Sequence, residues 1–95
     1  MKIPAVYIVA SSKNGTLYTG VTSDLVRRIY QHKNGLMDGF SKRYGCKILA
    51  FFEVYDDMYS AISREKQIKA GSRRKKIDLI EKQNPAWQDL YDTIA

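Results

Sequence analysis

A chain of 95 residues predicts one domain, spanning residues 1–95. Lysine and arginine total 16 against 10 aspartate and glutamate residues, so the formal net charge is +6. This charge favours a polyanionic partner such as nucleic acid, although a solvated basic surface without a partner is the simpler reading. Cys46 is the only cysteine, which excludes an internal disulfide and a zinc site made of cysteines.

The sequence shows no basic-then-apolar leader and no apolar run of roughly 18 residues. A single cysteine also suits a reducing compartment. We therefore expect a cytoplasmic protein with no membrane partner.

The first elements predicted are two paired strands. Residues 5–10 are apolar and predict a buried strand, and residues 17–21 predict its partner. An Asn-Gly pair at 14–15 lies between them, a strong signal for a β-hairpin. Each strand carries one tyrosine, Tyr7 and Tyr18, and aromatic residues are common in strands for structural reasons alone.

A helix is predicted from a cap at Thr22, Ser23 or Asp24 to about Lys33. Leu25 and Ile29 form its apolar stripe at a spacing of four residues. Arg28 and His32 have the same spacing and lie beside that stripe on one edge. A hairpin followed by this pair of polar residues is unusual for a purely structural unit.

Residues 35–45 hold three of the six glycines and predict a mobile loop. Lys42, Arg43 and Tyr44 give it the groups needed to touch a phosphate or a base, and a plain connection is the alternative. Residues 47–55 then predict a third strand.

The next predicted helix runs from about residue 58 to 70 and contains the sharpest physical anomaly in the sequence. Glu65 falls near the middle of the apolar stripe, which is formed by Met58, Ala61, Ile62 and Ile68. A buried carboxylate is costly unless a cation or hydrogen-bond donors compensate it. Glu65 is therefore either a metal ligand or one half of a buried ion pair with an arginine.

The last long helix opens with the basic run Arg73, Arg74, Lys75 and Lys76. Positive charge at a helix start opposes the helix dipole, so the run binds phosphate or is a solvated face. Asn84 and Pro85 end the helix. A short terminal helix containing Trp87 and Leu90 is expected to pack back on the core.

Together these elements predict an α+β domain with the order β-β-α-β-α-α. A three-stranded, mostly antiparallel sheet is flanked by helices.

The motifs resemble the GIY-YIG nuclease superfamily, and the likeness is nearest to small bacterial members with one domain. Ala5-Val6-Tyr7 matches the first signature, with Ala and Val in place of Gly and Ile, and Tyr18-Thr19-Gly20 matches the second. Arg28 lies eight residues after Gly20, at the position of the family arginine, and His32 and Glu65 match the family histidine and metal-binding glutamate. The same domain occurs in the excision-repair nuclease subunit and in homing endonucleases.

The resemblance implies the GIY-YIG fold and assigns roles to five residues. Tyr7 is expected as the general base, with Tyr18 and His32 assisting. Arg28 is expected to hold the phosphate, and Glu65 to hold Mg²⁺ or another divalent cation such as Mn²⁺. Asn84 matches an asparagine that some members use at the site, although an Asn before Pro commonly ends a helix.

We therefore predict an Mg²⁺-dependent endonuclease that acts on DNA, with damaged or branched DNA as candidate substrates and repair or recombination proteins as candidate partners. Six basic residues are expected at the nucleic-acid interface: Lys42, Arg43, Arg73, Arg74, Lys75 and Lys76. The alternatives are a nucleic-acid-binding module that keeps the fold but cuts poorly, and a subunit that only docks onto a repair complex.

Overall fold

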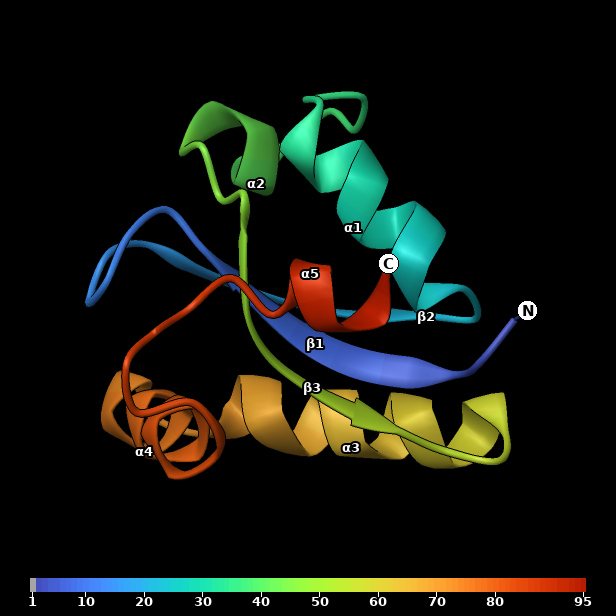
Figure 1. Cartoon of the computed structure of the whole chain (residues 1–95). Helices are drawn as coiled ribbons and strands as arrows, with labels where there is room; N and C mark the ends of the chain where they lie inside the picture. The colour runs from blue at the N-terminus through green and yellow to red at the C-terminus, as the bar shows by residue number, and fades with distance from the viewer. Residues whose placement is uncertain (1) are drawn as a thin grey trace.

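The apolar run after Pro4 forms β1 (Ala5–Ala10), the middle strand of the sheet, in the computed structural model, which describes residues 2–95. β1 pairs antiparallel with β2 (Leu17–Thr22) on one side and with β3 (Ile48–Val54) on the other. All six residues of β1 are buried, because helices cover both faces of the sheet (Figure 1).

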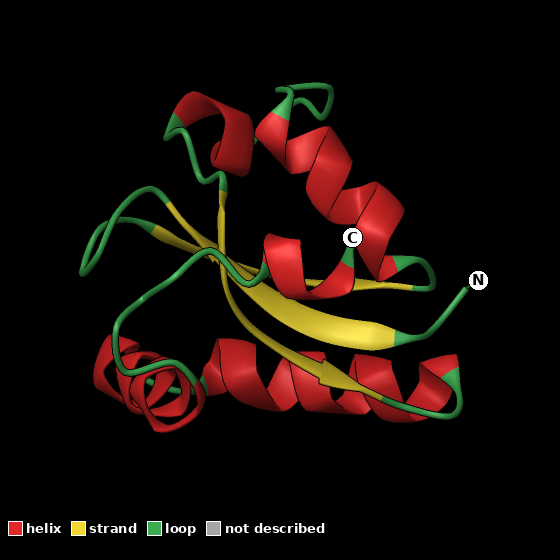
Figure 2. Ribbon diagram, viewed as in Figure 1, coloured by secondary structure: helices red, strands yellow, loops and turns green. Residues whose placement is uncertain are grey.

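The helices form a layer on each side of the sheet. α1 (Leu25–Lys33), the four-residue α2 (Phe40–Arg43) and α5 (Tyr91–Ile94) belong to one layer. α3 (Met58–Ala70) and α4 (Arg73–Gln83) form the other layer, below the sheet in the view of Figure 2. Within the described residues, no helix is both long and apolar enough to cross a membrane.

Alternate residues of β1 point into two separate cores. The core under α3 and α4 contains Val6, Ile8, Ala10, Ala50, Phe51, Ile68, Ile80 and Trp87. The core under α1 contains Ala5, Tyr7, Val9, Leu25, Ile29, Cys46 and Leu49. Tyr7 is therefore on the face of the sheet that α1 covers.

Three helices begin at a capping side chain. Asp24 caps α1, Asp57 caps α3 and Ser72 caps α4, each by accepting a hydrogen bond from the backbone N–H three residues later. These caps fix where α1 and α3 start, and so fix which of their residues face the sheet.

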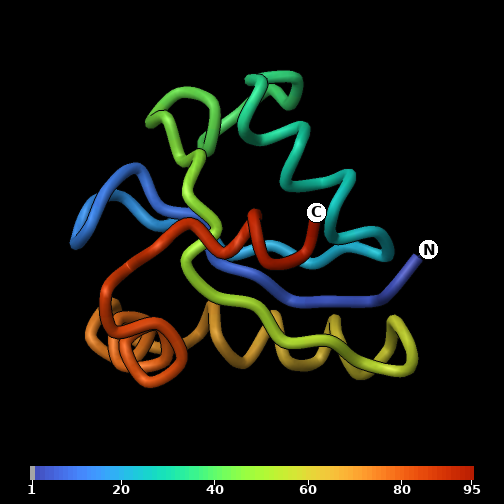
Figure 3. The backbone as a smooth tube through the Cα atoms, in the orientation of Figure 1, coloured from blue at the N-terminus to red at the C-terminus, as the bar shows by residue number. Residues whose placement is uncertain are grey.

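The C-terminal segment crosses from one layer to the other around the β3 edge of the sheet, as the tube in Figure 3 shows. Trp87 packs in the core under α3 and α4, whereas Tyr91 and Ile94 pack against the core under α1. Between them, the backbone N–H of Leu90 donates to the carbonyl oxygen of Leu49 in β3 at 2.8 Å.

The predicted fold class is confirmed, with four differences in detail. The sheet is wholly antiparallel, and the segment predicted as a mobile loop contains α2. The short terminal helix exists but begins at Tyr91, while Trp87 lies in the preceding turn with a φ of 55°. On α3, Ile62 is exposed, so the buried face is narrower than the apolar pattern suggested.

Candidate active site

Tyr7 lies at the centre of the candidate site. Its side chain has no exposed surface, and in the strand pairing it faces Gly20 of β2. A Cβ added to Gly20 would lie 2.5 Å from the phenol carbon Cζ of Tyr7, well inside any real contact. The glycine of the Tyr18-Thr19-Gly20 motif is therefore required because the Tyr7 ring packs directly over it.

His32, in the last turn of α1, joins Tyr7 to the segment that follows α1. Its Nε2 atom lies 2.8 Å from the Tyr7 hydroxyl oxygen, and its Nδ1 atom lies 2.8 Å from Oγ of Ser41. The Tyr18 ring is next to the imidazole, with 5.6 Å between ring centroids. Because His32 and Ser41 are both buried, this hydrogen-bonded chain is shielded from solvent.

Burial keeps both titratable groups of this pair neutral near neutral pH. Desolvation raises the pKa of Tyr7 to about 12, outweighing the Arg28 guanidinium, whose hydrogen bond and charge act to lower it. Desolvation and the charge of Arg28 together lower the pKa of His32 to about 4.

This result corrects one expectation from the sequence. A tyrosine base was expected to have its pKa lowered by nearby cations, Arg28 and His32 among them. Arg28 acts in that direction, but His32 is uncharged and burial dominates. Tyr7 therefore depends on a neighbouring acceptor to lose its proton, and the His32 imidazole is in position to be that acceptor.

Glu65 reaches the same site from α3. Its side chain is 12% exposed, and its charge acts on the Tyr7 phenol, whose pKa it raises. Glu65 follows Ala61 by four residues and precedes Ile68 by three, so it shares their buried helix face. The structure therefore places Tyr7 and Tyr18 in contact with His32, and it places Arg28 and Glu65 near enough for their charges to act on the Tyr7 phenol.

The ion-pair partner of Glu65 is a lysine. Nζ of Lys69 lies 2.7 Å from a Glu65 carboxylate oxygen, and the Lys69 side chain is half exposed. The arginine next to Glu65, Arg64, pairs with Glu53 instead, at 2.9 Å. The alternative of a buried Glu–Arg pair is therefore wrong, and an exposed, displaceable lysine holds the carboxylate.

A single carboxylate suits a magnesium ion. Mg²⁺ keeps several of its waters and is commonly bound through one or two carboxylates. Among the residues described, no three His, Cys, Asp or Glu side chains cluster as a metal cage, so Glu65 would act without such a set. The Glu65 carboxylate fits a hydrated divalent cation of this kind.

Asn84 does not belong to this cluster. Its side-chain nitrogen donates to the carbonyl oxygens of Ala50 and Gln88, at 3.1 and 2.7 Å, and its side-chain oxygen accepts from the Gln88 N–H. Ala50 is in β3, whereas Tyr7 packs over β2, on the other side of the sheet. In this structure Asn84 fastens the C-terminal segment to the sheet, and its place among the site residues stays a prediction.

The basic residues at the start of α4 differ in their surroundings. Arg73 donates to the carbonyl oxygens of Asn14 and Gly15 in the hairpin loop, at 2.8 and 2.7 Å, and Lys76 donates to the Gly71 carbonyl at 3.2 Å. Backbone carbonyls therefore compensate these two charges. Arg74 pairs with Asp78 at 3.3 Å, and Lys75 is exposed.

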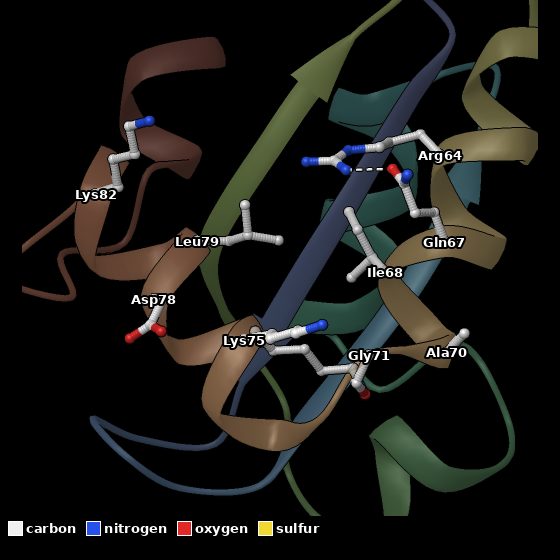
Figure 4. Close-up of a pocket in the computed structure, with 10 residues that line it drawn as sticks. Arg64, Gln67, Ile68, Ala70, Gly71, Lys75, Asp78, Leu79 and Lys82 are labelled. Carbon is white, nitrogen blue, oxygen red and sulfur yellow. Dashed lines mark hydrogen bonds between the residues drawn. The ribbon is translucent and has the colours of Figure 1, made fainter.

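Lys75 lies on the rim of a groove of about 570 Å³ between α3 and α4 (Figure 4). Ile68 and Leu79 point into this groove, and Lys82 and Asp78 lie along its α4 side (Figure 4). None of the five clustered side chains lines the groove. It is a basic surface separate from the Tyr7 site.

Two residues of the site were missed in the sequence. Ser41, which contacts His32, lies in the segment predicted as a loop, and a lone serine gives no pattern to find it by. Lys69 could have been found, because it follows Glu65 by four residues on a helix.

The family is shown by comparison with known proteins. Residues 3–78 match the GIY-YIG catalytic domain, and the chain belongs to this family. It thus has a nuclease-like fold, with Tyr7, Tyr18, Arg28, His32 and Glu65 all inside the matched range.

Within that family, the chain is similar to the small UPF0213 proteins. It is 40% identical over 75 residues to a UPF0213 protein of Staphylococcus saprophyticus, covering 79% of this chain and 90% of that protein. A UPF0213 protein of Haloquadratum walsbyi is 40% identical over 76 residues, covering 80% of this chain and 84% of that one. The solution structure of the UPF0213 protein BH0048 from Bacillus halodurans has a TM-score of 0.57 and 30% identity, covering 92% of each chain.

Proposed function

We propose that this protein is a metal-dependent endonuclease that hydrolyses phosphodiester bonds in DNA, with damaged or branched DNA as its substrates. The observation that carries the proposal is the buried contact of 2.8 Å between the Tyr7 hydroxyl and Nε2 of His32, beside Arg28 and Glu65. A core hairpin has no use for this combination of neutral acceptor, phenol, guanidinium and carboxylate.

Tyr7 and His32 act together as the base. The attacking water gives its proton to the Tyr7 oxygen as the Tyr7 hydroxyl proton passes to Nε2 of neutral His32. The two transfers are concerted, because pKa values of about 12 for Tyr7 and about 4 for His32 disfavour a free phenolate. As the bond between water oxygen and phosphorus forms, the bond from phosphorus to the leaving oxygen breaks, and that oxygen takes a proton from solvent. Tyr18 assists by packing its ring against the imidazole.

Arg28 and Glu65 are proposed to stabilise the negative charge of the phosphate during cleavage. The Arg28 guanidinium is always charged and can hold two phosphate oxygens at once. Glu65 would hold Mg²⁺ or Mn²⁺, and the bound cation would stabilise charge on the phosphate and on the leaving oxygen. Lys69 must release the Glu65 carboxylate for this, which its exposed side chain permits.

A nucleic-acid-binding module with little cleavage activity is the second candidate, and one observation favours it. Tyr7 has no exposed surface, so water has no path to the phenol in this conformation. Cleavage therefore requires the residues that cover Tyr7 to move when substrate binds. Binding of nucleic acid without cleavage requires no such movement.

A cleavage assay on nicked, branched and single-stranded DNA tests the proposal. We expect the parent protein to cut in Mg²⁺ and not in chelator. Glu65→Gln should reduce cutting to the level seen in chelator, and Tyr7→Phe should slow single-turnover cleavage by about 10²–10⁴. Asp92→Asn is the matched control, because it removes an exposed carboxylate on α5.

Thermal melts of the same variants show whether each remains folded. If folded Glu65→Gln and Tyr7→Phe cut at the parental rate, the assignment of the site is wrong. If the parent binds every substrate and cuts none, the second candidate is correct.

A further inference from the structure

Phe40 and Tyr44 form a pair of exposed aromatic rings on the segment above the site. Phe40 is 48% exposed and Tyr44 is 45% exposed, although each is large and apolar enough to be buried. Their ring centroids are 4.7 Å apart, with 43° between the ring planes. Phe40 is the first residue of α2 and Tyr44 follows its last residue, between Gly39 and Gly45, both of which have positive φ values.

The exposed pair is in contact with the candidate active site through a series of rings. Phe40 stacks on Tyr18, with centroids 6.4 Å apart and planes within 26°. Tyr18 lies against His32, and His32 contacts Tyr7. The surface formed by Phe40 and Tyr44 is thus continuous with the buried phenol.

Positive charge accompanies the two rings. The Arg43 guanidinium lies 5.6 Å from the centre of the Tyr44 ring, and Lys42 is about half exposed. Lys42 has only a loose pair, 3.7 Å from the fully exposed Asp38, which a phosphate can replace. Aromatic faces flanked by cations match the chemistry of a nucleic-acid strand whose bases are free to stack.

We propose that Phe40 and Tyr44 bind unpaired bases of the substrate, while Lys42 and Arg43 contact the phosphates of that same strand. Paired bases in a duplex already stack on each other and offer only their edges, so they cannot use these rings. The surface therefore selects single-stranded or unpaired regions. The further statement that it places the adjoining phosphate at Tyr7 and His32 rests on the proposed nuclease function.

Binding measured in chelator tests the surface without cleavage. The anisotropy of a fluorescent single-stranded oligonucleotide, and of a blunt duplex of the same length, is followed with the parent, Phe40→Ala and Tyr44→Ala. Base stacking on an aromatic residue contributes about 1–3 kcal/mol. Each variant should therefore lose about 5- to 150-fold in single-strand affinity, with duplex affinity changed by less than about twofold.

Two further variants make the result specific to the rings. Tyr59→Ala is the matched control, since Tyr59 is 82% exposed on α3 in the opposite layer, and its removal should leave single-strand affinity unchanged. Phe40→Trp keeps an aromatic face and should retain most of the affinity lost in Phe40→Ala. Melting curves of the ring variants should match that of the parent, because both rings are half exposed.

Three outcomes would overturn the inference: parental single-strand affinity in both alanine variants, equal losses on single strands and duplex, or an equal loss in Tyr59→Ala. The nuclease proposal fails separately. If Glu65→Gln cuts like the parent while the ring variants lose single-strand binding, the surface stands and the metal site does not.

Discussion

The Tyr7 phenol and the His32 imidazole are both kept neutral by the folded structure, and each makes stability depend on pH. The folded state holds the pKa of His32 at about 4, against 6.5 in an unfolded chain, and that of Tyr7 at about 12, against 10. Protons therefore bind differently to the folded and unfolded chains in two separate pH windows.

On the acid side, we expect the free energy of unfolding to fall as the pH falls from 6.5 to 4. In this window the unfolded chain binds a proton at His32 that the folded chain excludes, and the full effect is on the order of 3 kcal/mol. On the alkaline side, stability should fall from pH 10 to 12, since the unfolded chain releases the Tyr7 proton that the folded chain keeps.

Urea unfolding between pH 5 and 6.5 isolates the His32 effect, because most carboxylates stay ionised there. Burial acts to raise the pKa of Asp89, but its Lys33 partner and backbone hydrogen bonds outweigh this effect and lower it. The contribution of Asp89 to stability is therefore lost only at lower pH. His32→Gln should remove the slope in this range. A parent protein whose stability stays constant from pH 6.5 to 5 would contradict the assignment.

Residue patterns in the sequence predict the positions of the main site residues. They do not predict the properties of those residues that depend on burial. Tyr7 and Tyr18 are placed by strand pairing, and Glu65 by helix periodicity, both of which can be read from sequence. The direction of the Tyr7 pKa shift cannot be read, because it depends on how deeply α1 and the segment after it cover the ring. The contact between Ser41 and His32 joins two segments, and no local sequence pattern predicts how these segments pack.

At the scale of the elements, the predicted boundaries agree well with the structure where a cap or a breaker marks them. α3 runs over Met58–Ala70 as expected, with Asp57 at its start and Gly71 at its end. α2 was missed because four residues between glycines are too short to be helical by propensity alone. Contacts such as that of Ser41 with His32 hold this turn in place.

Asn84 joins α4, β3 and the C-terminal segment, and Asn84→Ala tests that structural role. The variant leaves the carbonyl of Ala50 and the backbone of Gln88 without their partner in a site that is 5% exposed. We expect the free energy of unfolding to fall by about 1–3 kcal/mol, measured by urea denaturation.

Asn34→Ala is the control, because Asn34 also follows the end of a helix but is exposed, and its side chain donates only to the Tyr30 carbonyl. This control should lose much less stability. If Asn84→Ala keeps parental stability but loses cleavage, Asn84 is a site residue, as the family pattern first suggested.

At the scale of the whole molecule, the residues behind the net charge of +6 lie in different surroundings. Lys42 and Arg43 lie with the exposed rings, whereas Lys75 and Lys82 lie beside the groove between α3 and α4. A count of charges in the sequence predicts the sign of the field. The count does not reveal that the Arg73 guanidinium donates hydrogen bonds to carbonyl oxygens of the hairpin loop. Only the tertiary structure shows these bonds.

Salt dependence of DNA binding separates these roles. We expect Lys75→Gln to flatten the slope of log K against log salt by about 0.7–0.9 if Lys75 contacts one phosphate. Arg73→Gln should change the slope less and should lower the melting temperature, because its hydrogen bonds to the hairpin loop are lost. Anisotropy titrations at several salt concentrations measure the slopes.

Lys66→Gln is the matched control, since Lys66 is exposed on α3. It is expected to leave both the slope and the melting temperature unchanged. An unchanged slope in Lys75→Gln would mean that the rim of the groove carries solvated charge only.

The central place of β1 has a consequence for how the chain folds as it is synthesised. β1 emerges first, yet its second neighbour, Ile48–Val54, lies about 40 residues later, which at 5–20 residues per second means a delay of roughly 2–8 s. During that delay β2 and α1 become available, but an isolated two-stranded hairpin is only marginally stable. The core around Tyr7 therefore stays incomplete until Cys46 and Leu49 are made, and the opposite face of β1 stays uncovered and prone to aggregation until α3 is made.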